Sequence, residues 1–237
     1  MALPRVLTFV PLSHDQAVNP VASLTFQRRV GRGAPVTWKV TPRMAERRAR
    51  MRDVGARLFA RSGVTGVSVM DVAQAADVPV SPAAHGYRRR PDLVFDILHA
   101  YVDVLHEYVG SADEAHETSV PELRLLAVIT ALLHGIHEHR DAHYLMLSMF
   151  PTLSEDRQEI LRYQMRTLIY RLAGPLSGVV PGLMVRRDLQ VPLLQSLIGM
   201  ASHAPTWFRE TGALSRPAYA ALIARAIIDA GRAAITV

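Results

Sequence analysis

Arginines that share one side of a predicted helix are the residues of this sequence best suited to chemistry. The chain holds 27 Lys and Arg residues in total, and Lys39 is its only lysine. At about 100° per residue, one arc beside an apolar stripe contains Arg43, Arg47, Arg50, Arg57 and Arg61. A guanidinium stays charged and binds phosphate oxygens in a bidentate manner. The spacing therefore favours contact with a polyanion, although a solvated arginine-rich surface fits the same pattern.

The distribution of charge along the chain supports a polyanionic partner for the N-terminal part. Residues 1–40 hold 5 basic and 1 acidic residue, net +4, and residues 41–100 hold 10 and 6, net +4. Residues 101–237 hold 12 basic and 14 acidic residues, net −2. A chain divided in this way indicates an N-terminal part that binds a polyanion and a nearly neutral remainder, although a solvated arginine-rich surface fits the same distribution.

Catalytic chemistry finds little support in the sequence. The chain has no cysteine, which excludes thiolate nucleophiles and cysteine–zinc sites. It has no Gly-x-Ser-x-Gly elbow, phosphate loop or dinucleotide fingerprint. The acidic pairs Asp113-Glu114 and Glu155-Asp156 are adjacent residues at helix starts or in loops, where the helix dipole favours them. We therefore expect no catalytic residue and no cofactor, with an enzyme of unrecognised helical type as an alternative.

A group of four histidines raises the question of a metal site. His134, His137, His139 and His143 lie close together in sequence, and imidazoles spaced by three or four residues on a helix can share an ion. However, helical geometry points the first two away from the second two. We predict no metal site, and a metal sensor remains an alternative.

Aromatic and methionine side chains in the second half could shape a pocket for a hydrophobic effector. The candidate ligand-binding residues are His137, Tyr144, Met149, Tyr163 and Trp207. Ordinary core packing explains the same residue types.

The elements that must position these residues are all helical. The periodicity predicts helices that begin at or just after Thr41-Pro42, Ser68, Ser81-Pro82, Pro91, Pro121, Asp141, Ser154, a point before Leu193, and Ser215. We expect the Pro91 helix to run to about Val109, a Gly- and Pro-rich loop over about 174–189, and a helix end near Gly212. No 20–50-residue repeat, strand-rich region or membrane span is evident. The fold class is all-α.

The segment from 68 to 86 reads as helix, tight break and short helix. Asp77-Val78-Pro79 forms the break, because proline cannot continue a helix and disfavours helical geometry just before itself. This is a helix-turn-helix arrangement, in which the second short helix enters the major groove and neighbouring arginines hold phosphates.

The same segment resembles a known family. Conspicuous stretches are Arg57-Leu58-Phe59, Gly63, Val67-Ser68-Val69, Asp71-Val72-Ala73, Ala76-Asp77-Val78 and the run from Tyr87 to Leu93. Over roughly residues 43–95 the chain is similar to the N-terminal domain of tetracycline-repressor-like (TetR family) transcriptional regulators. The resemblance implies a ligand-responsive homodimer, usually a repressor, whose last two helices form the dimer interface.

The resemblance, together with the helix geometry, gives a set of candidate DNA contacts. These are Arg43, Arg47, Ser68, Ser81, Ala83, Ala84, His85, Tyr87 and Arg90. The family usually reads Ser, any, Gly, Thr, Leu, Tyr, Tyr where this chain has Pro79 to His85, so Ala84 replaces an aromatic residue that touches phosphate. Arg90 stands where the family usually has a lysine. Alanine can touch a thymine methyl but cannot hydrogen-bond a base, so a relative that has lost specific operator recognition is the main alternative.

These observations define three expected parts. Residues 1–40 are expected to form a flexible basic arm, residues 41–90 the helix-turn-helix domain, and residues 91–237 the regulatory and dimerisation domain. Met44 is an alternative first residue, from which the compact part alone would be made. We expect no signal peptide. We therefore expect a cytoplasmic protein.

Overall fold

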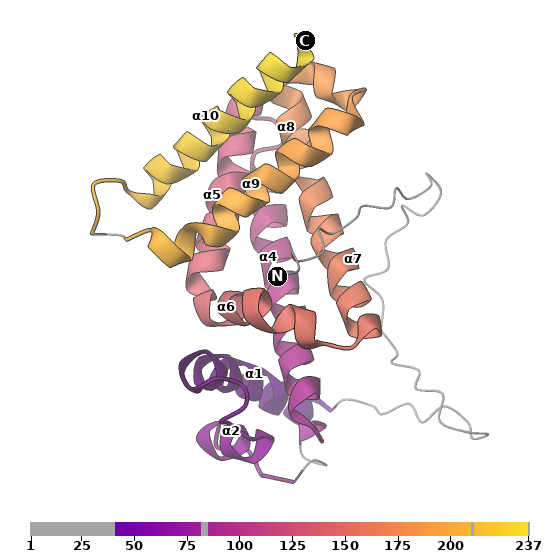
Figure 1. Ribbon diagram of the computed structural model, residues 1–237, viewed down its shortest axis with the longest axis vertical. Helices are drawn as coiled ribbons and strands as arrows, with labels where there is room; N and C mark the ends of the chain where they lie inside the picture. The colour runs from indigo at the N-terminus through magenta and orange to yellow at the C-terminus, as the bar shows by residue number, and fades with distance from the viewer. Residues whose placement is uncertain (1–40, 82–84, 210, 237) are drawn as a thin grey trace, which may run out of the picture. The chain divides into compact units, whose positions relative to one another are not determined.

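The computed structural model describes residues 41–81, 85–209 and 211–236. Every element described lies within residues 42–237, which form one compact unit. The expected N-terminal arm lies outside the described residues. Throughout the described part the secondary structure is helical without a strand, so the all-α prediction is confirmed (Figure 1). No helix in this part is long and apolar enough to cross a membrane.

The first two helices form what we call the head, residues 42–90. Helix α1 (Pro42–Ser62) begins at a first-turn proline and ends before Gly63, whose φ of +73° only glycine adopts without strain. Helix α2 (Val69–Ala75) follows. Within α1, a Cβ on Gly55 would lie 3.2 Å from Ile97 Cδ1. Ile97 belongs to helix α4 (Arg90–Ala115). Glycine at position 55 therefore lets α1 approach α4 closely.

The remaining helices form what we call the body, residues 91–237, although its central helix begins at the last residue of the head. Helix α4 (Arg90–Ala115) packs against α1, α5 (Pro121–Glu138), α6 (Arg140–Met149) and α7 (Glu155–Arg171). A 3₁₀ turn, η1 (Phe150–Thr152), joins α6 to α7. In Figure 1, α4 rises from the head into the body and α6 crosses it. Because α4 touches both parts, a tilt of α4 would move the head. It also runs six residues beyond the expected end at Val109.

The prediction of a loop over residues 174–189 is wrong in part. The segment contains helix α8 (Ala173–Val179) and a 3₁₀ turn, η2 (Pro181–Met184). Pro175 lies in the first turn of α8, where its missing N–H removes no helical hydrogen bond. Leu176 and Val179 are buried and anchor this short helix in the core.

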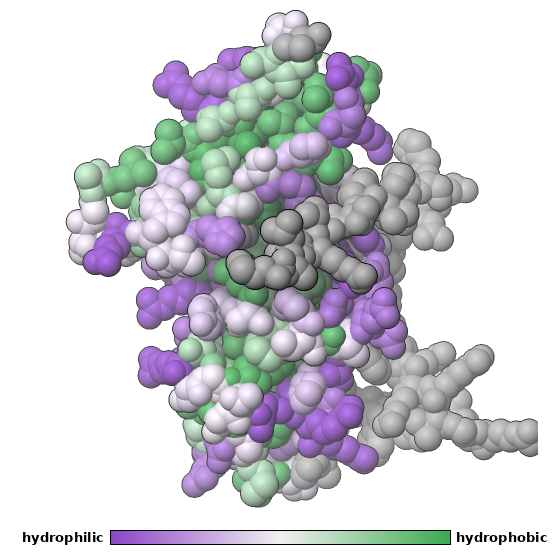
Figure 2. Space-filling model, viewed as in Figure 1, coloured by the Kyte–Doolittle hydropathy of each residue, from purple (hydrophilic) through white to green (hydrophobic). Residues whose placement is uncertain are grey.

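The final two helices lie side by side, with α10 and α9 at the upper part of Figure 1. Helix α9 (Arg187–Trp207) ends five residues before the expected Gly212, and α10 (Arg216–Ile235) is capped by the hydroxyl of Ser215. Figure 2 shows hydrophobic residues at the surface along this pair. On α10, an exposed stripe of apolar side chains comprises Ala218, Leu222, Ala226, Ala230 and Ala233.

Candidate nucleic-acid interface

A cationic groove of about 590 Å³ lies between α1 and the turn that follows α2. Its α1 side consists of Arg43, Glu46, Arg47 and Arg50, and its other side of Gln74, Asp77, Val78, Pro79 and Val80. Arg43 and Arg50 are exposed, and Arg47 is half-buried. Part of the arginine arc expected from helical spacing therefore lines one surface, where guanidinium groups can pair with phosphate oxygens.

The start of α2 is fixed by a reciprocal cap. The Ser68 hydroxyl accepts a hydrogen bond from the Asp71 backbone N–H at 3.1 Å, and an Asp71 carboxylate oxygen accepts one from the Ser68 N–H at 2.7 Å. These Ser68 hydrogen bonds lower the pKa of Asp71, and the charge of Arg90 contributes. The capping role expected for Ser68 is confirmed, while its contact with phosphate stays a prediction.

The break after α2 has the geometry of a sharp turn. Asp77 adopts a φ of +51°, in the left-handed region, and the Val78 N–H donates to the Ala73 carbonyl at 2.9 Å. The chain then emerges at Pro79, Val80 and Ser81, all exposed. Ser81 is thus placed at the surface as a DNA contact requires. The candidate contacts Ala83 and Ala84 lie outside the described residues.

Two other candidate contacts point into the protein. His85 is 1 % exposed and Tyr87 is 3 % exposed. The His85 Nδ1 accepts a hydrogen bond from the Tyr87 backbone N–H at 3.1 Å. Burial lowers the pKa of His85, against the opposing effect of the Val80 carbonyl. In this arrangement both side chains hold the end of the helix-turn-helix segment in place rather than reach toward a phosphate.

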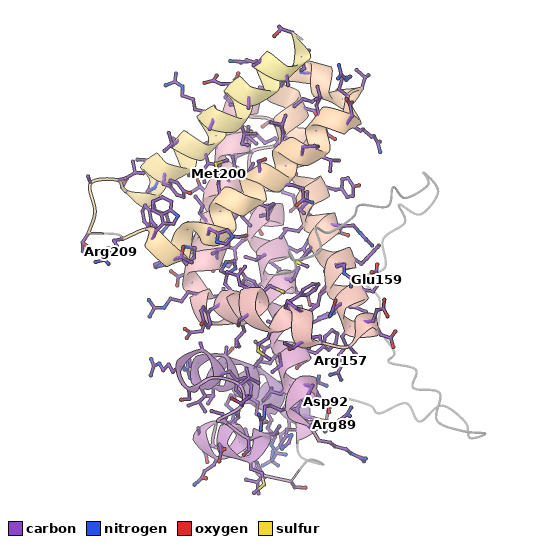
Figure 3. The ribbon with its side chains drawn as sticks, in the orientation of Figure 1. Arg89, Asp92, Arg157, Glu159, Met200 and Arg209 are labelled. Atoms are coloured by element: carbon purple, nitrogen blue, oxygen red, sulfur yellow. The ribbon has the colours of Figure 1, made fainter. Side chains whose placement is uncertain are left out.

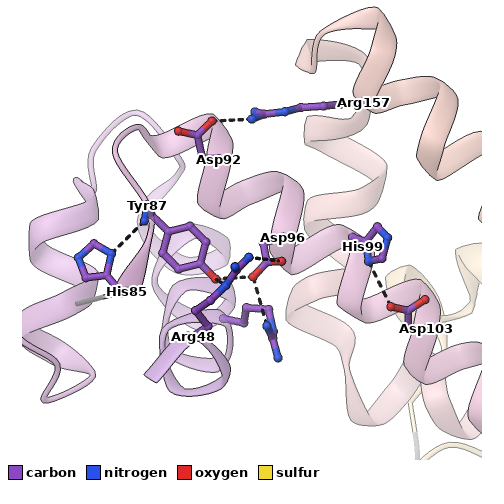
Figure 4. Close-up of polar contacts among 9 residues, drawn as sticks. Arg48, His85, Tyr87, Asp92, Asp96, His99, Asp103 and Arg157 are labelled. Carbon is purple, nitrogen blue, oxygen red and sulfur yellow. Dashed lines mark hydrogen bonds and ion pairs between the residues drawn. The ribbon is translucent and has the colours of Figure 1, made fainter. Parts of the chain in front are cut away.

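The Tyr87 hydroxyl is part of a polar cluster that joins the head to α4 (Figure 4). It donates a hydrogen bond to Asp96. Asp96 also pairs with Arg48 at 3.0 Å and with Arg52 at 3.2 Å. The Arg48 guanidinium additionally lies over the Tyr87 ring, 5.1 Å from its centroid. One carboxylate on α4 thereby holds two turns of α1 and the segment before α4.

The electrostatics of this cluster keep Asp96 ionised. Burial of the carboxyl group raises its pKa, but the hydrogen bond from Tyr87 and the charges of Arg48 and Arg52 together outweigh burial, so that the pKa is lowered. Burial and the neighbouring Asp96 charge raise the pKa of Tyr87, which stays protonated. The sequence offered a weak signal for this site, an acidic residue between Phe95 and Ile97.

Two arginines precede α4, and a third is its first residue. Arg88 and Arg89 are exposed, and Arg90 is the half-buried first residue of the helix. Arg89 lies 3.6 Å from Asp92, whose other partner is Arg157 at the start of α7 (Figures 3 and 4). The head thus carries positive charge at both ends of the helix-turn-helix segment, on α1 and just before α4.

The candidate ligand-binding residues do not converge on one cavity. Tyr144, Tyr163 and Trp207 are 58 %, 47 % and 55 % exposed. Trp207 packs edge-on against Tyr219, with ring centroids 5.2 Å apart. His137 is half-buried on α5, and Met149 is half-buried at the end of α6, where it lines a separate groove. Their role in ligand binding stays a prediction.

A series of buried hydrogen bonds crosses the body, and the sequence analysis did not predict it. The Tyr101 hydroxyl on α4 lies 2.7 Å from His143 Nδ1 on α6, and His143 Nε2 lies 2.7 Å from the Ser202 carbonyl on α9. The Ser202 carbonyl requires a donor at Nε2. Burial lowers the pKa of His143 and so favours the neutral ring, in which Nδ1 accepts the hydrogen of the Tyr101 hydroxyl. In the described parts of the chain, no group of three or more His, Cys, Asp or Glu residues could hold a metal ion.

Known proteins resemble this chain both in the sequence of its body and in its fold. Residues 118–230 match the family of tetracyclin repressor-like C-terminal domains. This match is independent of the head, since it starts beyond the segment whose residues carried the sequence resemblance. No curated protein matches the chain.

Solved structures share the fold over most of the chain. A TetR-family transcriptional regulator from Bordetella parapertussis 12822 is 26 % identical, with a TM-score of 0.65 over 77 % of this chain and 94 % of that one. The ketosteroid transcriptional regulator KstR2 of Mycobacterium tuberculosis is 19 % identical, with a TM-score of 0.60 over 77 % and 93 %. AibR in complex with isovaleryl coenzyme A and operator DNA is 19 % identical, with a TM-score of 0.59 over 77 % and 96 %.

Proposed function

We propose that this chain, which is a TetR-family transcriptional regulator by its C-terminal domain and its fold, binds double-stranded DNA as a homodimer and releases it when a small effector binds. In this proposal it acts as a repressor in the cytoplasm. The observation that carries the proposal is the cationic groove of the head, in which Arg43, Arg47 and Arg50 lie beside the turn that leads to Ser81. Such a surface binds DNA mainly through its phosphates.

The coupling between effector and DNA would run through α4. Asp96 fixes the head to α4 through Arg48, Arg52 and Tyr87, and the rest of α4 packs against α5, α6 and α7. An effector that tilts α4 changes the spacing of the two heads in a dimer. It does so only if it binds one spacing more tightly than the other. AibR, which shares this fold, has been solved in complex with both isovaleryl coenzyme A and operator DNA. That complex supports the proposal that this chain responds to a small effector.

The homodimer would form through α9 and α10. The exposed stripe on α10 is made of Leu222 and small alanines, which let a second helix approach closely. On α9, a Cβ added at Gly199 would meet no atom within 4 Å. Two copies that pair these faces would bury apolar surface that a single chain exposes.

Selection of bound fragments from genomic DNA at moderate salt tests the proposal. We expect the full-length protein to enrich one palindromic site, and we expect the Arg90→Ala variant to lose that enrichment because a phosphate contact is removed. Recovery of unrelated fragments by the unchanged protein would refute specific regulation.

A second function is favoured by one observation, the inward orientation of His85 and Tyr87 beside an unusual turn at Pro79. A head with these features could bind DNA without reading its sequence, and the protein would then act as a ligand-binding or interaction dimer. A salt titration separates the two functions. Non-specific binding alone falls steeply with salt and shows little preference among sequences.

A further inference from the structure

We propose that a second groove, at the junction of head and body, binds a small amphipathic carboxylic acid whose carboxylate pairs with Arg90. The groove has a volume of about 360 Å³, within the range of roughly 300–1,000 Å³ found for ligand pockets. Its lining comprises Val64 after α1, Arg90, Pro91 and Val94 at the start of α4, and Met149, Thr152 and Leu153 around η1. It is therefore formed by the segments that would move relative to one another if α4 tilted.

The side chains that line the groove favour a ligand with a hydrocarbon chain. Val94 and Leu153 are 1 % and 7 % exposed and form a buried floor, with Met149 half-buried beside them. The Thr152 hydroxyl donates its hydrogen to the Met149 carbonyl at 2.7 Å. It therefore has no hydrogen left for a ligand, and the groove offers hydrocarbon contact along most of its length.

The charge of the lining favours a negative end group. Among the residues that line the groove, Arg90 is charged and none is acidic. Arg90 takes no part in the ion pairs formed within 42–81 and 85–209, whereas its neighbour Arg89 pairs with Asp92. The Asp71 carboxylate feels the charge of Arg90, but it is held by the Ser68 N–H. A ligand carboxylate would thus give the Arg90 guanidinium a bidentate partner next to an apolar surface.

The position of Arg90 links this site to DNA. Arg90 is also a predicted phosphate contact, so this regulatory step rests on the proposed function. One guanidinium cannot pair fully with a ligand carboxylate and a DNA phosphate at once. The acid would therefore weaken DNA binding, and DNA would weaken binding of the acid by the same factor.

Calorimetry of the full-length, DNA-free protein with sodium decanoate below its micelle concentration tests the site directly. We expect saturable binding, and binding of decan-1-ol or decyltrimethylammonium weaker by about ten-fold or more. Arg90→Gln should weaken decanoate binding by a similar factor of about ten or more. Arg88→Gln is the matched control, since Arg88 is exposed and does not line the groove, and it should bind decanoate as the unchanged protein does. Absence of decanoate binding, equal binding of decanol, or equal binding by Arg90→Gln would overturn the proposal.

A second arm measures DNA affinity of the same proteins with and without decanoate. We expect decanoate to weaken DNA binding by the unchanged protein and by Arg88→Gln. If Arg90-dependent decanoate binding leaves DNA affinity unchanged, the competition for Arg90 is refuted. If the unchanged protein binds no DNA at all, the proposed function fails, while the calorimetric comparison still decides whether the acid site exists.

Discussion

The guanidinium of Arg157, at the start of α7, lies 2.5 Å from an Asp92 carboxylate oxygen at the start of α4. A second nitrogen of Arg157 donates to the Pro91 carbonyl at 2.8 Å. Asp92 is at the same time the acceptor that caps α4, since it receives the Arg89 N–H at 3.1 Å. Burial raises the pKa of Asp92, but the hydrogen bond and charge of Arg157, with help from Arg89, lower it overall. This pair thus fastens α7 to the first turn of the helix that joins head and body.

Replacement of Arg157 by methionine should destabilise the protein while keeping most of the side chain's apolar contacts. Loss of two charge-assisted hydrogen bonds, one to a carboxylate that is 24 % exposed, should lower the free energy of unfolding by about 1–3 kcal/mol. Urea unfolding at pH 7 measures the change. The matched control is Arg162→Met on the same helix, because Arg162 pairs with Glu159, which is 55 % exposed. The control should cost less than about 1 kcal/mol, and equal effects would contradict the role given to Arg157.

Asp96→Asn should lower the free energy of unfolding by more than Arg157→Met does, because it removes a negative charge that pairs with both Arg48 and Arg52. We expect a loss of about 2–3 kcal/mol in the free energy of unfolding at pH 7. The two arginines remain partly exposed and stay hydrated, which keeps the loss below that of a fully buried pair.

The pH dependence of this effect follows from the direction of the shift. The pKa of Asp96 is lowered in the folded protein, so its contribution is present above the unfolded-state pKa of about 3.9. The contribution is lost as the pH falls from that value through the folded-state pKa. The stability difference between the unchanged protein and Asp96→Asn should therefore hold from pH 7 to about 5 and shrink below about pH 4. A difference that grows on acidification would contradict the ion-pair account.

Tyr87→Phe separates a structural from a DNA-binding role for this tyrosine. The hydroxyl donates to Asp96 inside the protein, so its removal should lower the free energy of unfolding by about 1 kcal/mol. DNA affinity, measured below the unfolding transition, should change little. The opposite result, unchanged stability with weakened DNA binding, would show that the hydroxyl turns outward to a phosphate.

Local sequence signals were sufficient where one residue type determines the backbone. Pro42, Pro91 and Pro121 lie in the first turns of α1, α4 and α5 as expected, because the N–H that proline lacks has no helical partner in the first turn. This preference is not absolute, since Pro192 and Pro205 lie inside α9. The same rule explains the error at α8. Pro175 and Gly174 look like a break in sequence, yet the buried contacts of Leu176 outweigh the weak helix propensity of the segment.

The candidate site was harder to predict, because it depends on contacts between distant segments. Ser68 could be recognised as a cap, since its partner Asp71 is three residues away. By contrast, Tyr87 looked available for phosphate until its pairing with Arg48, 39 residues earlier, was known. Aromatic residues on amphipathic helices likewise gave no way to tell that Tyr144 and Trp207 face outward. Side-chain direction in these cases is fixed by tertiary packing rather than by residue type.

His143→Gln should change how stability depends on pH near neutrality. Burial lowers the pKa of His143, against the opposing hydrogen bond to the Ser202 carbonyl. The lowered value means that neutral His143 stabilises the folded protein above the unfolded-state pKa of about 6.5, and that this contribution is lost as the pH falls below it. Unfolding in urea at pH 7.5 and 5.5 should show a larger loss for the unchanged protein than for the variant. His85, His106 and His137 are present in both proteins, so their contributions cancel in the comparison. The remaining difference reports His143 together with its electrostatic coupling to His203.

Leu222→Glu tests the α9–α10 face as the dimer interface. Leu222 is 55 % exposed in the single chain and lies in the apolar stripe of α10, so a glutamate there should leave the monomer folded but place a charge in the interface. Light scattering after size-exclusion chromatography should show a dimer for the unchanged protein and a monomer, or a dimer weakened by about ten-fold or more, for the variant. Leu123→Glu is the matched control, since Leu123 on α5 is 54 % exposed and lies on neither α9 nor α10. A dimer that survives Leu222→Glu but is lost in Leu123→Glu would move the interface away from the last two helices.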